Sequence, residues 1–249
     1  MKIGKQLIII IAVVVLLILV VVAVVEYQKS KSMGALAERI FSESSKTSTD
    51  TVESLKAAIA ANEKQLEQYV QTASKTGTYW KLLALRLQDR GLHGEALKAL
   101  ERALYYNPTD AALHYYTGLS AGMMAKSFHA FPGSVNTDRN QYYDLAEESY
   151  LRSIELDPVY LRPRYGLAVL YVFELNRPED AVPQLQQCLT ISPNDIDSMF
   201  VLARAYYMLK SYQDALNLYD RIIKIVTNEQ RKTEAQNNRQ MVLEQMHRG

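Results

Sequence analysis

The chain opens with one unbroken apolar stretch and continues with segments in which apolar residues recur at helical spacing. Residues 7–25 (LIIIIAVVVLLILVVVAVV) contain no polar side chain. A helix of that length spans about 28 Å, close to the hydrocarbon thickness of a bilayer. Because a single segment in lipid can satisfy its backbone groups only as a helix, residues 7–25 are predicted to form one transmembrane helix.

The flanking charges say little about orientation, because two lysines precede the apolar stretch and two follow it. The short tail, residues 1–6, favours an uncleaved signal anchor with the N-terminus in the cytoplasm. The alternative is a cleaved signal peptide with a weak site at residues 21–23, but the apolar run is longer than a usual signal core. We therefore expect a single-pass protein of the inner (cytoplasmic) membrane, with its remaining residues periplasmic or extracytoplasmic.

After a polar linker at residues 26–50, residues 51–73 are predicted to form an amphipathic helix. Two interpretations remain open: the helix packs on the following domain, or it pairs with a second copy in a short coiled coil. The second would make the chain a homo-oligomer through residues 51–73, although barely three heptads are available. The stripe on one face of this helix consists of Val52, Leu55, Ile59, Asn62, Leu66, Tyr69 and Val70.

The rest of the chain repeats itself. Four alanines that open the second half of each repeat are spaced by 50, 35 and 34 residues: Ala96, Ala146, Ala181 and Ala215. Three prolines that end helical stretches are spaced by 50 and 35 residues: Pro108, Pro158 and Pro193. A period of about 34 residues is typical of stacked helix–turn–helix units.

These residues resemble the tetratricopeptide repeat pattern, which also places a small residue where the two helices of a unit cross, here Ala84, Gly118, Ala168 and Ala203. The resemblance implies an all-α solenoid with a polar capping helix at its end. Its units are predicted at residues 77–110, 111–160, 161–195 and 196–227, with the capping helix at 228–249.

The second unit carries sixteen extra residues between Ala121 and Ala146, predicted to lie in the turn between its helices. They include Phe128, His129 and Phe131. Insertions in repeat proteins often contact partners, but these phenylalanines would equally suit a passive loop that packs on adjacent helices.

The resemblance implies a concave face lined by the first helix of each unit. That face is rich in the aromatic, Met and Arg side chains that are enriched at protein interfaces. We expect a groove for a helix or extended peptide, unless one of the chain's own helices fills it. The candidate groove residues are Lys81, Leu85, Gln88, Tyr115, Leu119, Met123, Arg162, Tyr165, Val169, Phe173, Phe200, Arg204, Tyr207 and Met208.

Composition excludes several other classes of protein. The net charge is +1, and residues 32–249 carry 24 Lys and Arg against 26 Asp and Glu, so no nucleic-acid partner is expected. The single Cys188 excludes an internal disulfide and multi-cysteine metal sites. Four scattered histidines and the lack of a glycine-rich phosphate loop give no catalytic, cofactor or metal site.

We therefore expect a membrane-anchored, non-enzymatic scaffold that binds protein partners and serves a bacterial cell-envelope complex such as a secretion, pilus or flagellar assembly. The alternative is a receptor or co-chaperone facing the cytosol. Lys81 fits the clamp with which related co-chaperones hold a chaperone C-terminus, but Leu85 and Tyr116 do not. A third possibility, an enzyme with an unrecognised site, has only His129 in its favour.

Overall fold

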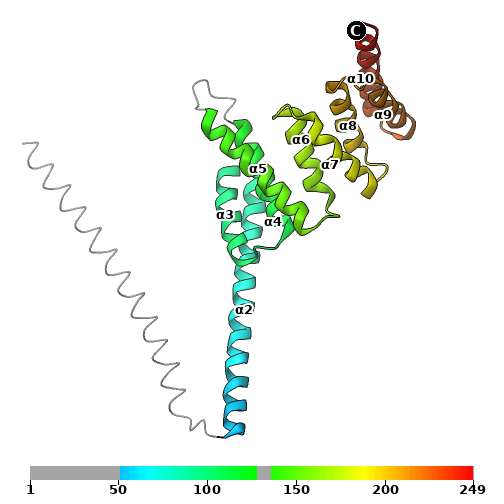
Figure 1. Cartoon of the computed structure of the whole chain (residues 1–249). Coiled ribbons are helices and arrows are strands. Elements are labelled where there is room, and N and C mark those ends of the chain that lie inside the picture. The colour runs from blue at the N-terminus through cyan, green and yellow to red at the C-terminus, as the bar shows by residue number, and fades with distance from the viewer. Residues whose placement is uncertain (1–50, 128–135, 249) are drawn as a thin grey trace, which may run out of the picture. The chain divides into compact units, whose positions relative to one another are not determined.

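The computed structural model of this chain describes residues 51–127 and 136–248, and every regular element in those two ranges is an α-helix (Figure 1). The chain divides into two compact units, one ending at Tyr69 and the other beginning at Val70. No helix within the described ranges is long and apolar enough to cross a bilayer. The predicted transmembrane segment 7–25 and the linker 26–50 lie outside these ranges.

The first described helix, α2 (Val52–Asp89), contains 38 residues without a break. The helix predicted at residues 51–73 and the first helix of the unit predicted at 77–110 both lie within this one helix. Gly77 does not interrupt α2: it is buried, and a Cβ atom there would lie 2.7 Å from Tyr106 Cβ. The glycine therefore permits a close approach between helices. The hydroxyl of Thr76 also donates a hydrogen bond of 2.9 Å to the Thr72 carbonyl inside the helix.

The second unit consists of helix hairpins followed by a final helix. From α3 to α10 each helix packs on the next, and α4 also contacts α6, which contacts α8. The first helices of successive hairpins are therefore neighbours, which confirms the predicted all-helical solenoid. The helices after α2 are α3 (His93–Tyr106), α4 (Ala111–Ser127), α5 (Asn136–Leu156), α6 (Leu161–Phe173), α7 (Pro178–Ile191), α8 (Ile196–Met208), α9 (Tyr212–Ile225) and α10 (Glu229–Arg248).

The small residues and prolines of the repeat pattern account for this packing. Ala84, Ala168 and Ala203 are each 0% exposed, so the helices that cross at them come close together. The helices α3, α5 and α7 each end two residues before a proline, whose ring cannot donate to a carbonyl of the preceding turn. The predicted helix ends are confirmed at all three prolines.

The insertion in the second unit is not a sixteen-residue loop. Helix α4 continues to Ser127 and α5 begins at Asn136, so α5 reaches 21 residues where α3 and α7 have 14. Most of the extra residues therefore lengthen the two helices of this hairpin. The candidate residues Phe128, His129 and Phe131 lie outside the part of the chain that the structure describes.

Helix α10 occupies the position predicted for the capping helix and packs on α9. It buries Ala235 and Val242, which are 0% and 2% exposed, in a cluster with Met199, Tyr219 and Ile222. Its other residues are mostly polar. An apolar inner face and a polar outer face are what a solenoid needs at its end.

Candidate functional site

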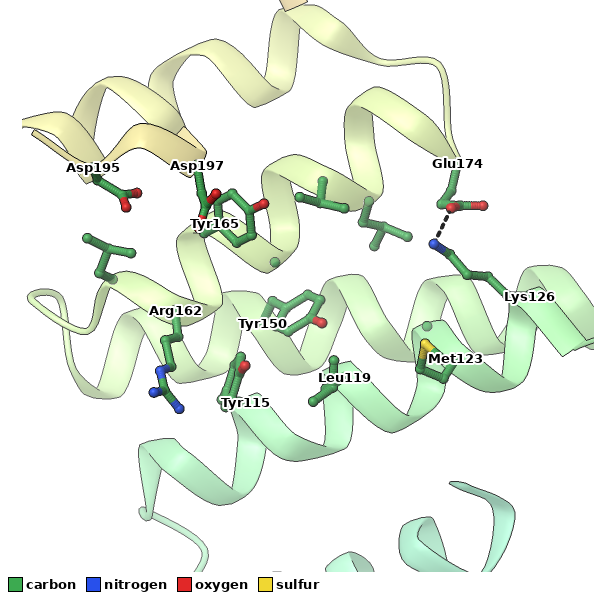
Figure 2. A pocket seen from close by; sticks show the side chains of 15 residues that line it. Tyr115, Leu119, Met123, Lys126, Tyr150, Arg162, Tyr165, Glu174, Asp195 and Asp197 are labelled. Carbon is green, nitrogen blue, oxygen red and sulfur yellow. Dashed lines mark ion pairs between the residues drawn. The ribbon is translucent and has the colours of Figure 1, made fainter. Parts of the chain in front are cut away.

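A cavity between α4 and α6, called the first cavity below, has a volume of about 400 Å³ and is open to solvent. One wall is α4, on which Tyr115, Leu119 and Met123 follow each other at intervals of four residues and therefore share one face (Figure 2). The facing wall is α6, with Tyr165 and Val169. Most of this lining is apolar, although the cavity is on the surface.

The floor of this cavity is the ring of Tyr150, which α5 inserts between α4 and α6. A Cβ atom on Gly118 would lie 2.7 Å from that ring, and one on Gly166 would lie 2.8 Å from it. Both glycines are therefore needed where the ring passes. Tyr115 extends the aromatic surface, with its ring centroid 6.2 Å from that of Tyr150 and 5.5 Å from that of Tyr160. Burial, with a smaller effect of Tyr115, raises the pKa of Tyr150.

Charged side chains mark the two ends of the cavity. At one end Lys126 and Glu174 form an ion pair of 2.8 Å (Figure 2). The hydroxyl of Tyr143 donates a hydrogen bond of 2.7 Å to the same carboxylate. Burial, reinforced by Glu174, raises the pKa of Tyr143 to about 12. At the other end Arg162 lies beside Tyr115, and Asp195 and Asp197 line the cavity from the start of α8.

A second cavity, of about 290 Å³, follows along the solenoid. It contains four predicted groove residues: Phe173, Phe200, Arg204 and Tyr207. Its remaining lining includes Glu234, Asn238 and Met241, which belong to α10.

Helix α10 also covers part of this region. Arg231 stacks over Phe200 at 5.0 Å and pairs with Asp197 at 2.6 Å. The expectation that one of the chain's own helices occupies the groove therefore holds at Phe200. It does not hold at the first cavity, which α10 does not line.

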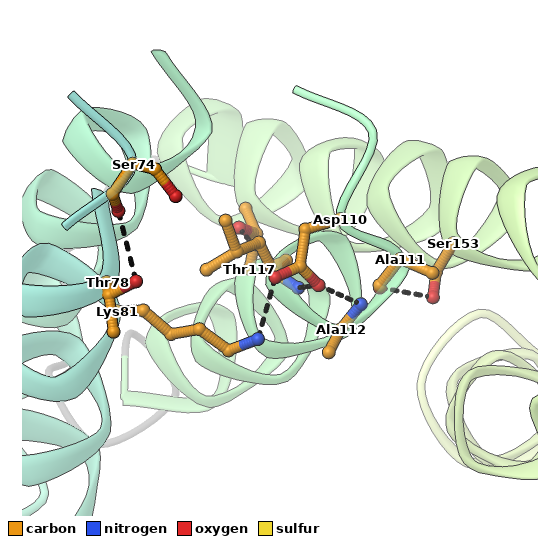
Figure 3. Close-up of polar contacts among 9 residues, drawn as sticks. Ser74, Thr78, Lys81, Asp110, Ala111, Ala112, Thr117 and Ser153 are labelled. Atoms are coloured by element: carbon orange, nitrogen blue, oxygen red, sulfur yellow. Dashed lines mark hydrogen bonds and ion pairs between the residues drawn. The ribbon is translucent and has the colours of Figure 1, made fainter. Parts of the chain in front are cut away.

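Three other predicted groove residues have different surroundings. Leu85 lines a wide depression with Tyr115 and Leu119. Lys81 forms an ion pair of 2.7 Å with Asp110, so its ammonium group is engaged within the chain (Figure 3). Burial alone would raise the pKa of Asp110, but the hydrogen bond and charge of Lys81 hold it below its ordinary value. Met208 packs against the core.

Sequence reasoning missed several residues of the first cavity. Tyr150 is a buried core residue, and it is also the cavity floor. Lys126 and Glu174 lie beyond the positions that usually line such a groove. Gly122 was overlooked, although a glycine in the middle of a helix is itself a signal, because alanine is the more stable choice there.

Within residues 51–127 and 136–248, no three His, Cys, Asp or Glu side chains lie close enough together to hold a metal ion. Cys188 is 0% exposed, and burial raises the pKa of its thiol. A ring nitrogen of His114 lies 2.9 Å from the Pro108 carbonyl oxygen, so it serves the turn between α3 and α4.

Comparison with known proteins agrees with the repeat pattern. A profile of the tetratricopeptide repeat family matches residues 172–233. Over 204 residues the chain is 23% identical to a TPR repeat-containing protein of Borreliella burgdorferi, covering 82% of this chain and 86% of that protein. Together these matches support a tetratricopeptide repeat protein.

Solved structures similar to this chain include a bacterial and a human protein. MamA of Desulfovibrio magneticus RS-1 has a TM-score of 0.52 and 14% identity, over 68% of this chain and 94% of that one. The human IFIT1 dimer with m7Gppp-AAAA has a TM-score of 0.60 and 21% identity, over 78% of this chain and 45% of that one. At such identities the likeness shows the fold alone.

Proposed function

We propose that this tetratricopeptide repeat protein is a scaffold that binds a segment of another protein in the cavity between α4 and α6. One observation carries the proposal: a cavity of about 400 Å³, lined by Tyr115, Tyr165 and Met123, is open to solvent between the first helices of two neighbouring hairpins. Aromatic and Met side chains at such a site are typical of protein interfaces. A concave apolar site is also where a partner's side chain loses the most water-exposed area.

The neighbouring surfaces support a binding site longer than one cavity. Phe173 is 54% exposed at the end of α6 and belongs to the second cavity. On the other side, Tyr115 and Leu119 also face the depression that contains Leu85. A helix or extended peptide lying along these first helices would contact all three places.

The proposal is tested by replacing Tyr165 with alanine in the full chain and measuring recovery of its partner from cell membranes. We expect recovery to fall at least tenfold, because aromatic anchors dominate binding energy at interfaces. Tyr105→Ala is the matched control, since Tyr105 is 75% exposed and lines neither cavity. Equal recovery with both variants would contradict groove binding.

The setting of this scaffold is also part of the proposal: residues 7–25 anchor it in the inner membrane, and it serves a cell-envelope complex. The support is the uninterrupted apolar stretch in the sequence. Protease treatment of intact and of permeabilised cells distinguishes this setting from the alternative of a cytosol-facing receptor. Protection only in cells with an intact outer envelope supports an extracytoplasmic solenoid, whereas protection until the inner membrane is opened supports the alternative.

We also propose that residues 51–73 pair with the same residues of a second copy. The observation in its favour is that the stripe on this helix is exposed: Leu55 is 46%, Ile59 55% and Leu66 63% exposed. In a parallel pair Asn62 would face Asn62 of the other copy, which suits an amide better than an apolar neighbour.

A further inference from the structure

The insertion in the second unit lengthens both helices of its hairpin at the same end. Helix α4 ends nine residues after its small crossing residue Gly118, whereas α6 and α8 end five residues after theirs, Ala168 and Ala203. Helix α5 begins ten residues before Ala146, whereas α3 and α7 begin three residues before the equivalent alanines. The insertion therefore adds about one turn to the end of α4 and about two turns to the start of α5.

The added turns give two side chains a helical position that their counterparts lack. Lys126 lies in the added turn of α4, and the corresponding residues of the next two units, Asn176 and Ser211, follow the ends of α6 and α8. Tyr143 corresponds to the first residue of α3 and of α7, but the added turns of α5 precede it. Both side chains are therefore held by regular helix at the level where the other hairpins have their turns.

Lys126 and Tyr143 meet at one carboxylate of the next hairpin. The ammonium group of Lys126 lies 2.8 Å from Glu174, and the hydroxyl of Tyr143 donates a hydrogen bond of 2.7 Å to the same side chain. Glu174 follows the last residue of α6, and its side chain is only 14% exposed. Hydrogen bonds to an ionised group are roughly twice as strong as neutral ones. The lengthened helices of the second hairpin thus hold the end of α6.

A second link lies one turn farther along α5. Glu147, four residues after Tyr143, accepts hydrogen bonds of 3.1 Å from Arg177 and of 2.8 Å from the hydroxyl of Tyr171. The guanidinium group of Arg177 also lies over the ring of Tyr171, at 4.5 Å. The turn between α6 and α7 is therefore attached to α5 at both of its ends, through Glu174 and through Arg177.

We propose that the insertion serves as an internal brace, formed by Lys126, Tyr143 and Glu174, which fixes the width of the first cavity at this end. Lys126 and Glu174 both line the cavity, and their ion pair spans it (Figure 2). The ring of Tyr150 limits how closely α4 and α6 can approach each other. The brace limits how far their ends can separate, whichever molecule binds between them.

Hydrogen exchange of the full chain in lipid nanodiscs, measured by mass spectrometry, tests whether the brace holds the turn. The backbone N–H groups of Glu174, Leu175 and Arg177 donate to carbonyls in the last turn of α6, so they are protected while the turn is held. Glu174→Ala should speed their exchange at least tenfold. The N–H groups of residues 209–211 donate in the same way after α8 and should keep the wild-type rate.

Glu155→Ala is the matched control, because Glu155 is also on α5 or its neighbouring turn but pairs only with Arg152 in its own helix. It should leave exchange at residues 174–177 unchanged. Lys126→Met and Tyr143→Phe each remove one contact of the brace and should each speed this exchange several-fold; they decide the question if Glu174→Ala does not fold. Wild-type exchange in all three brace variants, or equal acceleration in Glu155→Ala, would overturn the proposal.

The effect on the cavity is measured separately, with spin labels at Met123→Cys on α4 and Leu209→Cys after α8. Both positions are exposed, whereas the native Cys188 is 0% exposed. Double electron–electron resonance should give a narrow distance distribution in the labelled chain, and a broader one with a longer mean when Glu174→Ala is added. An unchanged distribution, with accelerated exchange at the turn, would show that these contacts hold the turn but do not fix the cavity, and would overturn the proposal.

Discussion

The ring of Tyr150 occupies the space that a side chain on Gly118 would need, since a Cβ atom there would lie 2.7 Å from the ring. The same ring excludes a side chain at Gly166 on the next hairpin. One tyrosine on α5 thus sets the distance between α4 and α6 and forms the floor of the cavity between them. The Tyr150 ring therefore determines both how closely the two repeats pack and how deep the cavity between them is.

Gly118→Ala is expected to lower stability by about 1–3 kcal/mol, because the buried ring cannot move without disturbing both neighbouring helices. Gly122→Ala on the same helix is expected to be neutral or to stabilise by up to about 1 kcal/mol, because its Cβ atom enters open space. Urea unfolding of the two variants checks this contrast. Similar effects from both substitutions would show that Tyr150 does not limit the approach of α4 and α6.

Alkaline pH should weaken the fold through Tyr143. Its pKa is raised from 10.0 to about 12 in the folded state, by burial first and then by Glu174. A raised pKa means that the folded state holds the proton more tightly, so this contribution is complete below pH 10 and is lost as pH rises toward 12. The urea midpoint should therefore fall over that interval.

The substitution Tyr143→Phe removes the titrating hydroxyl and should make the fall in the urea midpoint between pH 10 and 12 less steep. Tyr105→Phe, at an exposed position, should keep the wild-type slope. If the Tyr143→Phe slope equals that of the wild type, the pKa of Tyr143 is not raised by burial and Glu174 in the folded state.

The sequence predicted the repeats well because their signals are local. Prolines stop helices, and small residues at fixed positions allow helices to cross, so the register of the hairpins follows from spacing alone. The continuity of α2 was not predicted, because the sequence does not show why Gly77 stands inside a helix. Its actual reason is Tyr106, which lies 29 residues later in the chain and packs against it.

Part of the candidate site could be predicted, because some of its residues occupy fixed positions in the repeat. Tyr115 and Tyr165 occupy equivalent positions on the first helices of two units, so their common cavity follows from the repeat. The ion pair between Lys126 and Glu174 depends on how neighbouring hairpins stack. The engagement of Phe200 by Arg231 depends on where α10 folds back. Neither relationship has a signature in the order of residues.

Removal of α10 should expose the end of the solenoid. A chain truncated after Val226 loses the cover over Tyr219 and Ile222, which are 4% and 0% exposed in the full chain. We expect this chain to aggregate and to melt at a lower temperature, as measured by light scattering during heating. A soluble truncated chain with unchanged melting would show that α10 is not a cap.

Pairing through residues 51–73 should be sensitive to one charge placed in the apolar stripe of this helix. Ile59→Asp is expected to convert a dimer to a monomer in analytical ultracentrifugation of the full chain, because an aspartate would be buried in the seam. Melting of the repeats should stay unchanged, since Ile59 is 55% exposed. A wild-type chain that is already monomeric, or a variant of unchanged mass, would contradict pairing through this helix.

The central claim, that the cavity between α4 and α6 binds a protein segment, is tested most directly by photo-crosslinking in living cells. A photoreactive phenylalanine analogue replaces Met123, which is 43% exposed in the cavity, or Tyr105, which is 75% exposed and outside it. We predict a discrete crosslinked partner from position 123 that is absent from position 105 and lost when Tyr165→Ala is added. The same products from both positions, or none from position 123, would contradict it.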